Sequence, residues 1–181
     1  MAILPPVQIK RRPQSIDDFV ALRGEIATTP QGGAAMMVIA LLVFAQDQDL
    51  GRQCLTVAAD RGRLQQGDQG YKGWQLSRRD LQRIQRQIQR QEYLPRSYIH
   101  DAAPENGYTI PTPPWTIECS DNPYSGDLAS GAYKVFVACS GASTPRPVTL
   151  KRNDKGFWKA SEWSSLIVGI QAPVETIDDD L

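Results

Sequence analysis

The chain has 181 residues, of which 41% are hydrophobic and 22% charged, and its 20 basic side chains balance its 20 acidic ones. This composition is typical of globular domains and excludes collagen-like, intrinsically disordered and disulfide-scaffold proteins. A chain of this length can bury about 70% of its unfolded surface, which is enough for one core, so we expect a single domain.

The first 14 residues predict an extended arm in front of that domain. Three prolines restrict their backbone, and the run KRR at residues 10–12 is basic. A basic segment followed by an apolar one does not occur here, so a secretory signal is not expected. We place the domain at residues 15–172 and an acidic tail, which contains three consecutive aspartates, at residues 173–181.

Helices are predicted between residues 16 and 92. Ser15 and Ser77 are each followed three residues later by aspartate, which is the pattern of a capping box at a helix start. Pro30 suits a first helical position. The apolar run of residues 34–45 is too short to cross a membrane, which takes about 20 residues, and instead predicts a central buried helix. The expected helices cover about residues 16–27, 30–46, 49–60 and 78–92.

Two glycine-rich stretches raise the question of phosphate binding. The sequence GGAA at residues 32–35 favours close helix packing, because the Lys-Ser/Thr of a phosphate loop does not follow it. The sequence GDQGYKGW at residues 67–74 favours a flexible loop that Tyr71 and Trp74 anchor in the core. A nucleotide-phosphate loop there would need a strand before it and Lys-Ser/Thr after it, and the sequence predicts neither.

The last predicted helix is amphipathic, basic and rich in glutamine. Leu81, Ile84 and Ile88 form one narrow apolar stripe, and arginines and glutamines occupy most of the remaining positions. We expect this helix to pack on the domain by its stripe and to expose its arginines. The stripe is too short for an independent coiled coil, although a second copy of the chain could complete it. The candidate binding residues are Arg78, Arg79, Arg83, Arg86 and Arg90.

After Pro114 the pattern changes to short runs of β-branched and aromatic residues, which predict antiparallel strands. Residues 96–112 contain several prolines and predict a long linker or a loop over the core. The sequence KRNDKG at residues 151–156 predicts a hairpin turn with glycine at a positive φ. Residues 162–165 could form a helical turn. The expected strands are Trp115–Cys119, Tyr133–Cys139, Pro147–Lys151, Phe157–Ala160 and Leu166–Ile170. The fold class is therefore α+β, with a helical N-terminal half packed on a small antiparallel β-sheet from the C-terminal half.

Residues 130–170 contain the segments GAYKVFV, PRPVTLK, KGFWK and EWSSLIVG. With these segments the chain resembles an uncharacterised bacterial family, one of the domains of unknown function. The resemblance implies an α+β fold, and it implies no activity, cofactor or catalytic residue.

Charge is unevenly distributed along the chain. Residues 61–100 hold nine basic and three acidic side chains, a net charge of +6, whereas residues 101–181 hold six and eleven, a net charge of −5. The basic surplus could bind the phosphates of a nucleic acid. It could equally be solvated or paired with the acidic half, and this interpretation is favoured because no helix-turn-helix, zinc-finger or RNA-stacking motif accompanies it.

Catalysis by a cysteine and the single histidine is a further hypothesis. His100 beside Asp101 could act as general base, with Cys119, Cys139 or Ser140 as nucleophile. A nucleophile elbow, Gly-x-Ser-x-Gly, does not occur in the sequence. The hypothesis requires His100 to lie within hydrogen-bond reach of a thiol or hydroxyl in a cleft.

Two residues of the C-terminal half are further candidates for ligand binding. If Phe157 faces the core, Trp158 points the other way, and an exposed tryptophan beside lysines would suit capture of a peptide. Burial of Trp158 in the core is the favoured alternative. Arg146 lies between two prolines, which predicts a rigid turn.

The three cysteines are odd in number and dispersed, which favours reduced thiols in a cytoplasm. One histidine and no Cys-x-x-Cys predict no metal site, and no cofactor is expected. We therefore expect a non-enzymatic binding or assembly module of the bacterial cytoplasm that contacts another protein or a second copy of itself rather than a membrane. The alternatives are a nucleic-acid-associated protein that uses the arginine-rich helix 78–90, and a Cys/His-dependent hydrolase.

Overall fold

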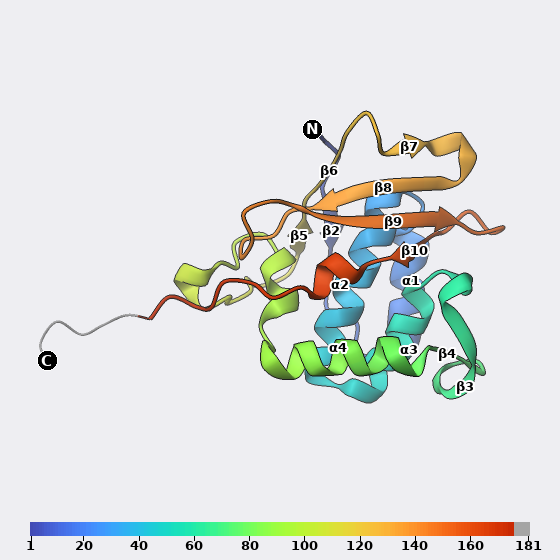
Figure 1. The fold of residues 1–181 in the computed structure, drawn as a ribbon, viewed down its shortest axis with the longest axis horizontal. Helices are drawn as coiled ribbons and strands as arrows, with labels where there is room; N and C mark the ends of the chain where they lie inside the picture. Colours follow the sequence, from blue (N-terminus) through green and yellow to red (C-terminus); the bar gives the residue numbers. More distant parts are fainter. Residues whose placement is uncertain (176–181) are drawn as a thin grey trace, which may run out of the picture.

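A computed structural model describes residues 1–175 (Figure 1). Helices come mainly from the N-terminal half and antiparallel strands mainly from the C-terminal half, so the predicted α+β fold class is confirmed. In the described residues, no helix combines the length and the apolar character that crossing a membrane requires.

Four α-helices form close to where the capping and spacing patterns place them. The residue just before a helix caps it by accepting a hydrogen bond from a backbone N–H of the first turn. The hydroxyl of Ser15 accepts from the backbone N–H of Asp18, and that of Ser77 from Asp80, both at 3.1 Å. Thr29 caps the helix that starts at Pro30 in the same way. The helices are α1 (Ile16–Ile26), α2 (Pro30–Gln46), α3 (Gln48–Ala58) and α4 (Arg78–Arg90).

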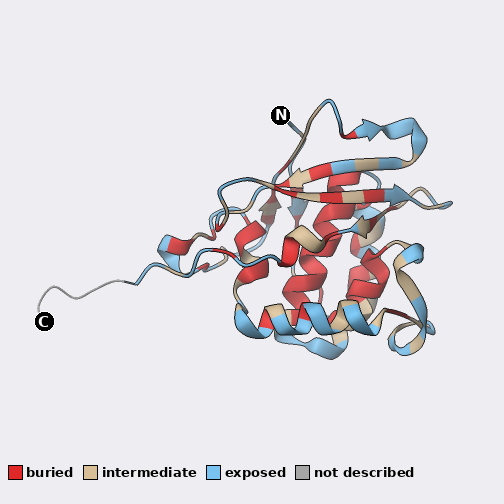
Figure 2. Cartoon of the chain, viewed as in Figure 1, coloured by how far each residue is buried: buried red, intermediate tan, exposed pale blue. Residues whose placement is uncertain are grey.

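Helix α2 is the centre of the core. Residues 30–44 of it are all buried, because α1, α3 and the sheet cover it on different sides (Figure 2). A Cβ atom on Gly33 would lie 2.6 Å from the carbonyl oxygen of Trp158, so α2 approaches the neighbouring strand more closely than any other residue type would allow. The close-packing interpretation of residues 32–35 is therefore confirmed.

The main sheet is antiparallel and mixes the two ends of the chain. Its strand order is β1-β6-β8-β9-β10, and β7 pairs with β8. Alternate residues such as Val135, Val148 and Leu150 are buried toward the helices. The strands are β1 (Ala2–Ile3), β6 (Cys119–Asp121), β7 (Gly126–Asp127), β8 (Ala132–Val137), β9 (Arg146–Arg152) and β10 (Trp158–Glu162).

The predicted hairpin joins β9 to β10. Gly156 has a φ of +86°, and the side chain of Asn153 accepts hydrogen bonds from the backbone amides of Lys155 and Phe157. The hairpin prediction is confirmed.

The prediction of a last strand at Leu166–Ile170 is wrong. A 3₁₀ turn, η5 (Ser164–Ile167), occupies its first half. Side chains take the backbone groups that a neighbouring strand would use: Tyr98 donates to the carbonyl of Leu166, and Gln91 both donates to and accepts from Ile170. The segment is therefore fixed without a strand partner.

The first residues are extended, as expected, but they belong to the fold. Besides β1, residues Val7–Ile9 form β2, which pairs with β5 (Trp115–Ile117) in a second, two-stranded sheet. The side chains of Val7 and Ile9 are 6% and 0% exposed. The core thus includes side chains from in front of residue 15, whereas the three consecutive aspartates of the predicted tail lie outside the described residues.

The prediction of a glycine-rich loop at residues 67–74 is also wrong, because the segment is part of a hairpin of β3 (Leu64–Tyr71) and β4 (Trp74–Leu76). A Cβ atom on Gly67 would lie 2.0 Å from the side-chain oxygen of Gln75. The same oxygen accepts a hydrogen bond from the backbone N–H of Gln69. Gly73 turns the chain at a φ of +82°. The glycines permit close approach and a tight turn rather than flexibility.

Residues 96–112 are mostly irregular, as predicted, with 3₁₀ turns η2 (Leu94–Tyr98) and η3 (Pro104–Asn106). Two aromatic rings hold this segment on the core. Tyr98 and Tyr108 are 2% and 0% exposed, and Tyr108 stacks on Tyr93 with 5.1 Å between the ring centres.

Candidate functional site

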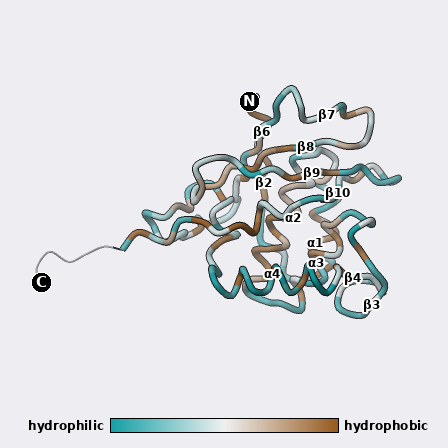
Figure 3. Tube along the Cα trace, viewed as in Figure 1, coloured by the Kyte–Doolittle hydropathy of each residue, from teal (hydrophilic) through white to brown (hydrophobic). Residues whose placement is uncertain are grey.

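Helix α4 lies on the outside of the molecule and is attached by a narrow stripe. Ile84 and Ile88 are its buried residues, and Leu81 is partly buried against the same core. The hydrophilic colour along α4 in Figure 3 contrasts with the hydrophobic colour of α2. The prediction that this helix packs by its stripe and exposes its arginines is confirmed. The exposed residues of α4 are Arg78, Arg79, Gln82, Arg83, Gln85, Arg86, Gln89 and Arg90.

Four of the arginines form one row along α4. Arg79, Arg83, Arg86 and Arg90 follow one another at spacings of four, three and four residues, so they share one face of the helix. The row spans about 16 Å at the rise of an α-helix. Arg78, Gln82, Gln85 and Gln89 form a parallel row beside it with the same spacing.

The arginines of α4 are not neutralised by the rest of the described chain. Within residues 1–175, none of the five guanidinium groups forms an ion pair, whereas those of Arg52 and Arg63 do. The acidic half therefore does not pair with this helix in the described part of the chain. The five positive charges face solvent.

A polar hollow of about 500 Å³ lies where α4 begins, between its first turns and the segment that leads into β3. Arg79 and Arg83 line it together with Arg63. The guanidinium of Arg63 lies 3.0 Å from Asp80 and 3.5 Å from Glu162, and it stacks over Trp163 at 4.7 Å. Arg63 is therefore fixed, and Arg79 and Arg83 are the cations that this hollow offers to a ligand.

The carboxylate of Glu162 belongs to the same arrangement. Hydrogen bonds from Ser164 hold the pKa of Glu162 below its ordinary value, and Arg63 and Arg83 lower it further. Glu162 consequently stays ionised at neutral pH and helps to fix Arg63.

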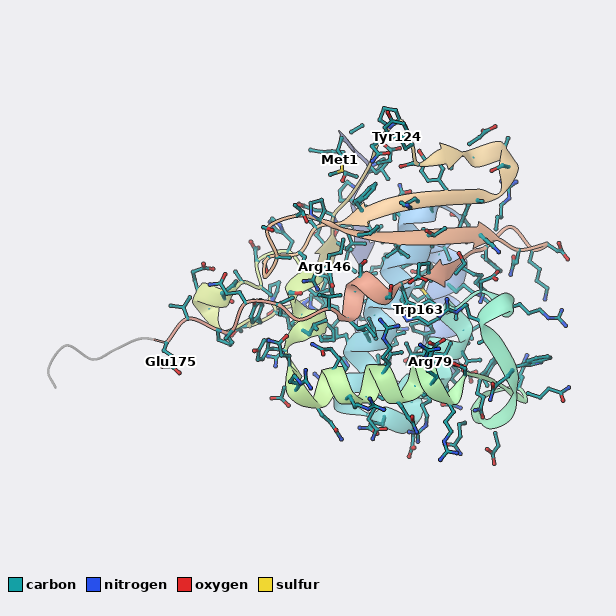
Figure 4. All side chains as sticks on the ribbon, in the orientation of Figure 1. Met1, Arg79, Tyr124, Arg146, Trp163 and Glu175 are labelled. Atoms are coloured by element: carbon teal, nitrogen blue, oxygen red, sulfur yellow. The ribbon has the colours of Figure 1, made fainter. Side chains whose placement is uncertain are left out.

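The β3–β4 hairpin extends the positive surface beyond the N-terminal end of α4. Lys72 at the turn of the hairpin and Arg61 in the 3₁₀ turn η1 (Arg61–Arg63) just before β3 are exposed there. Each lies over an aromatic ring, Arg61 at 5.5 Å from Trp74 and Lys72 at 5.3 Å from Tyr71. Figure 4 labels Arg79 at the end of α4 that faces this hairpin. We call the five arginines of α4 together with Arg61 and Lys72 the basic surface. Arg61 and Lys72 are not among the candidate residues predicted from the sequence, because no hairpin was predicted beside the helix.

The two other candidate binding residues do not form a ligand surface. Arg146 is 9% exposed, and its guanidinium donates hydrogen bonds to the carbonyls of Val168 and Gly169 and, at 3.3 Å, to the hydroxyl of Tyr98. Its partners are thus parts of the protein. Figure 4 shows Arg146 away from Arg79.

The hypothesis of an exposed Trp158 is wrong. Trp158 is 3% exposed, and the half-buried neighbour is Phe157, which lies under the guanidinium of Arg23 at 4.7 Å. The absence of a side chain on Gly33 makes room for Trp158 against α2. The favoured alternative, burial in the core, is therefore confirmed.

The histidine and one cysteine line a common hollow of about 260 Å³, but they do not form a catalytic pair. One ring nitrogen of His100 lies 3.3 Å from Asp101 and the other 3.4 Å from Glu118. The sulfur of Cys139 lies 3.3 Å from the hydroxyl of Ser97. Within residues 1–175, no hydrogen bond joins His100 to a thiol or hydroxyl, so the contact that the hydrolase hypothesis requires is not made.

The other two cysteines are buried and unreactive. Burial raises the pKa of Cys119 to about 12, and burial together with Asp47 raises that of Cys54 to about 12. In the described range, no three His, Cys, Asp or Glu side chains gather in a way that could hold a metal ion.

The fold and the surface together define a small α+β domain that exposes a basic helix and hairpin. Residues 11–174 match the model of a family described as a domain of unknown function (DUF6935), and the chain belongs to that family. The match extends over nearly the whole chain, well beyond the residues that carry the resemblance in the sequence, and confirms that resemblance. No curated protein and no solved structure matches the chain significantly.

Proposed function

We propose that this domain is a non-enzymatic binding module that binds nucleic acid through the phosphates along its basic surface. The observation that carries the proposal is the row of exposed arginines on α4, none of which is ion-paired within residues 1–175. Nucleic acid was the alternative that sequence reasoning ranked below a paired or solvated face. Intramolecular pairing, one of the two favoured alternatives, is not made by these arginines in the described residues, and this supports the proposal.

The chemistry of the row suits phosphates. A guanidinium is planar, always charged and able to donate two parallel hydrogen bonds to one phosphate. The row of about 16 Å carries four guanidinium groups, so it can contact several phosphates of a nucleic acid at once. Binding releases the cations condensed on those phosphates, which favours association.

The zero net charge of the chain does not oppose this binding. Charges are screened over about 8 Å at physiological salt, so a phosphate near α4 senses the local arginines rather than the distant acidic residues. Two acidic side chains near the N-terminal end of the row, Asp80 and Glu162, are already paired with Arg63.

A second copy of the chain does not suit this surface. Ile84 and Ile88 are already buried in their own domain, so no apolar stripe remains for a partner helix to complete. Two α4 helices placed face to face would also bring like charges together, which is unfavourable. An acidic protein is the remaining alternative partner for this surface.

We place this activity in a reducing compartment, the bacterial cytoplasm. The support is that all three cysteines are free, with two of them buried in the core. Such a distribution suits a protein that is not held together by disulfides.

The test is a fluorescence-anisotropy titration of the protein against a labelled duplex at about 50 and 200 mM salt. The variant Arg83→Gln/Arg86→Gln/Arg90→Gln keeps helix-forming residues and removes three charges. The matched control, Lys134→Gln/Lys151→Gln/Lys155→Gln, removes three exposed charges from the sheet and its hairpin. We expect the arginine variant to bind at least about tenfold more weakly and to flatten the slope of log K against log salt by about three, with little change in the control.

Two outcomes would overturn the proposal. Equal losses in the two variants would show a general charge effect without a role for α4. Poly-glutamate that competes as well as unlabelled duplex at equal charge would show that the surface binds acidic protein instead.

A further inference from the structure

Helix α4 lies on the surface of the domain and packs on it by a narrow stripe. Only Ile84 and Ile88 are buried, and exposed residues occupy most of the remaining circumference along the whole helix. A helix with its side chains is about 10–12 Å wide, and the major groove of B-form DNA is about 12 Å wide. A helix attached along one narrow stripe therefore offers the rest of its surface to such a groove.

We propose that α4 enters the major groove of double-stranded DNA and that its glutamine row contacts the edges of the bases. This inference rests on the proposed function and names the nucleic acid that the basic surface binds. It assigns the arginine row chiefly to phosphates and the row of Gln82, Gln85 and Gln89 to bases.

The glutamine row has unused hydrogen-bonding capacity. Gln91, just beyond the helix, uses its side-chain amide on the backbone of Ile170. Gln82, Gln85 and Gln89 are exposed, and within residues 1–175 their side chains make no hydrogen bond. A glutamine amide both donates and accepts, so it can pair with N6 and N7 of adenine in the major groove.

Arg61 and Lys72 fit the same arrangement. The β3–β4 hairpin, which carries Lys72 and directly follows the 3₁₀ turn of Arg61 in the chain, lies beyond the N-terminal end of α4 (Figure 1). With the helix in a groove, cations at its end meet the phosphate backbone that borders the groove. Arg61 and Lys72 would then position the helix on the DNA without contributing to sequence specificity.

The surface lacks what binding of single strands requires. Single-stranded nucleic acids are commonly held by exposed aromatic rings on which bases stack. Trp74 and Tyr71 near this surface are partly buried, and Arg61 and Lys72 lie over their rings. The large apolar side chains that are exposed in the described residues lie elsewhere: Met1, Ile3, Tyr124, Leu128, Val168 and Val174.

Double-stranded RNA is a poorer fit for a different reason. The major groove of an A-form helix is deep and narrow, so side chains on an inserted α-helix cannot reach its bases. Sequence-independent contacts to phosphates would remain available. We therefore expect both RNA duplexes and single strands to bind, but more weakly than DNA duplexes.

The first experiment compares labelled double-stranded DNA, double-stranded RNA and single-stranded DNA of one length and sequence at one salt concentration. We expect the DNA duplex to bind at least about tenfold more tightly than either competitor, since the groove contacts are lost in both. Equal or tighter binding of RNA duplex or single strand would overturn the groove inference and leave the proposed function intact. Failure of all three to bind would overturn both.

The second experiment tests the glutamine row directly. In a duplex built with 7-deazapurines a C–H group replaces each N7, which removes major-groove acceptors and leaves the phosphates and the minor groove unchanged. We expect the wild-type protein to bind this duplex several-fold more weakly than the ordinary one, and the variant Gln82→Ala/Gln85→Ala/Gln89→Ala to bind both alike. Far-UV circular dichroism checks that the variant retains its helices. Equal binding of the two duplexes by the wild type would contradict base contacts.

Discussion

Three free thiols have very different environments in this fold. Cys54 and Cys119 are 0% and 3% exposed, and burial raises the pKa of each to about 12. Cys139 is partly exposed and borders two surface hollows. A thiol reacts as its thiolate, so a buried thiol with a raised pKa stays protonated and inert across neutral pH.

We therefore expect one thiol per chain to react with a disulfide reagent in the native protein between about pH 7 and 9, and three after denaturation. The variant Cys139→Ser should abolish the fast native reaction, whereas Cys54→Ala should leave it unchanged. The measurement is the release of the coloured thiolate of the reagent over time. Fast native labelling in Cys139→Ser would contradict the assignment.

Arg146 acts as a structural clamp rather than a binding residue. Its guanidinium ties the carbonyls of Val168 and Gly169 to β9, at a position that is nearly closed to solvent. The variant Arg146→Gln leaves these acceptors without partners, so we expect it to lower the free energy of unfolding by about 2–4 kcal/mol. The exposed Lys134→Gln on the neighbouring strand should change it by less than about 0.5 kcal/mol. Urea titration measures both, and equal values would refute the clamp.

Contact between α2 and the sheet depends on a single glycine. A Cβ atom at Gly33 would lie 2.6 Å from a backbone oxygen of β10, which cannot move away without shifting the strand. Gly24 in α1 has nothing within 4 Å of the corresponding position. Alanine is a better helix former than glycine by about 1 kcal/mol. Alanine at Gly24 therefore tests helix propensity alone, whereas alanine at Gly33 tests propensity and packing together.

The expected effects of alanine at these two positions have opposite signs. Gly24→Ala should raise the free energy of unfolding by about 0.5–1 kcal/mol, because propensity acts alone there. Gly33→Ala should lower it by about 1–3 kcal/mol, because overpacking outweighs propensity. Thermal unfolding compares the two variants with the wild type. A stabilised Gly33→Ala protein would show that α2 can move away from β10.

Elements that depend on local signals could be predicted from the sequence. The caps at Ser15 and Ser77 and the apolar residues of α2 and α4 act within one helix, so they identify α1, α2 and α4. The β9–β10 hairpin likewise follows from its turn residues. The arginine face of α4 belongs to the same class, because exposure on one side of a helix follows from periodicity alone.

Elements that depend on distant partners could not be predicted. β2 has only three residues, and its partner β5 lies about a hundred residues further on, so its V-x-I alternation is too short a signal. Leu166–Ile170 has the composition of a strand, but the side chains of Tyr98 in η2 and of Gln91 just after α4 hydrogen-bond to its backbone. The hypothesis of an outward-facing Trp158 is wrong because Trp158 packs against Gly33 of α2, and this tertiary contact has no local sequence signal.

At the scale of the whole molecule, the helical and the β half depend on each other. Almost all of α2 is buried, and part of that burial comes from β8, β9 and β10 of the C-terminal half. The N-terminal strands β1 and β2 pair with β6 and β5, which also belong to that half. Neither half can therefore bury its apolar surface alone, and the domain is expected to unfold in one cooperative step.

This expectation can be tested because the two halves carry different spectroscopic signals. Far-UV circular dichroism reports mainly the helices of the N-terminal half. In the variant Trp74→Phe the remaining tryptophans, Trp115, Trp158 and Trp163, all lie in the C-terminal half and are each 3% exposed. We expect the two signals to change at the same urea concentration and with the same slope, because loss of the sheet exposes α2. Tryptophan emission that changes well before the helical signal would show that α2 remains packed without the sheet, and that the halves are separate folding units.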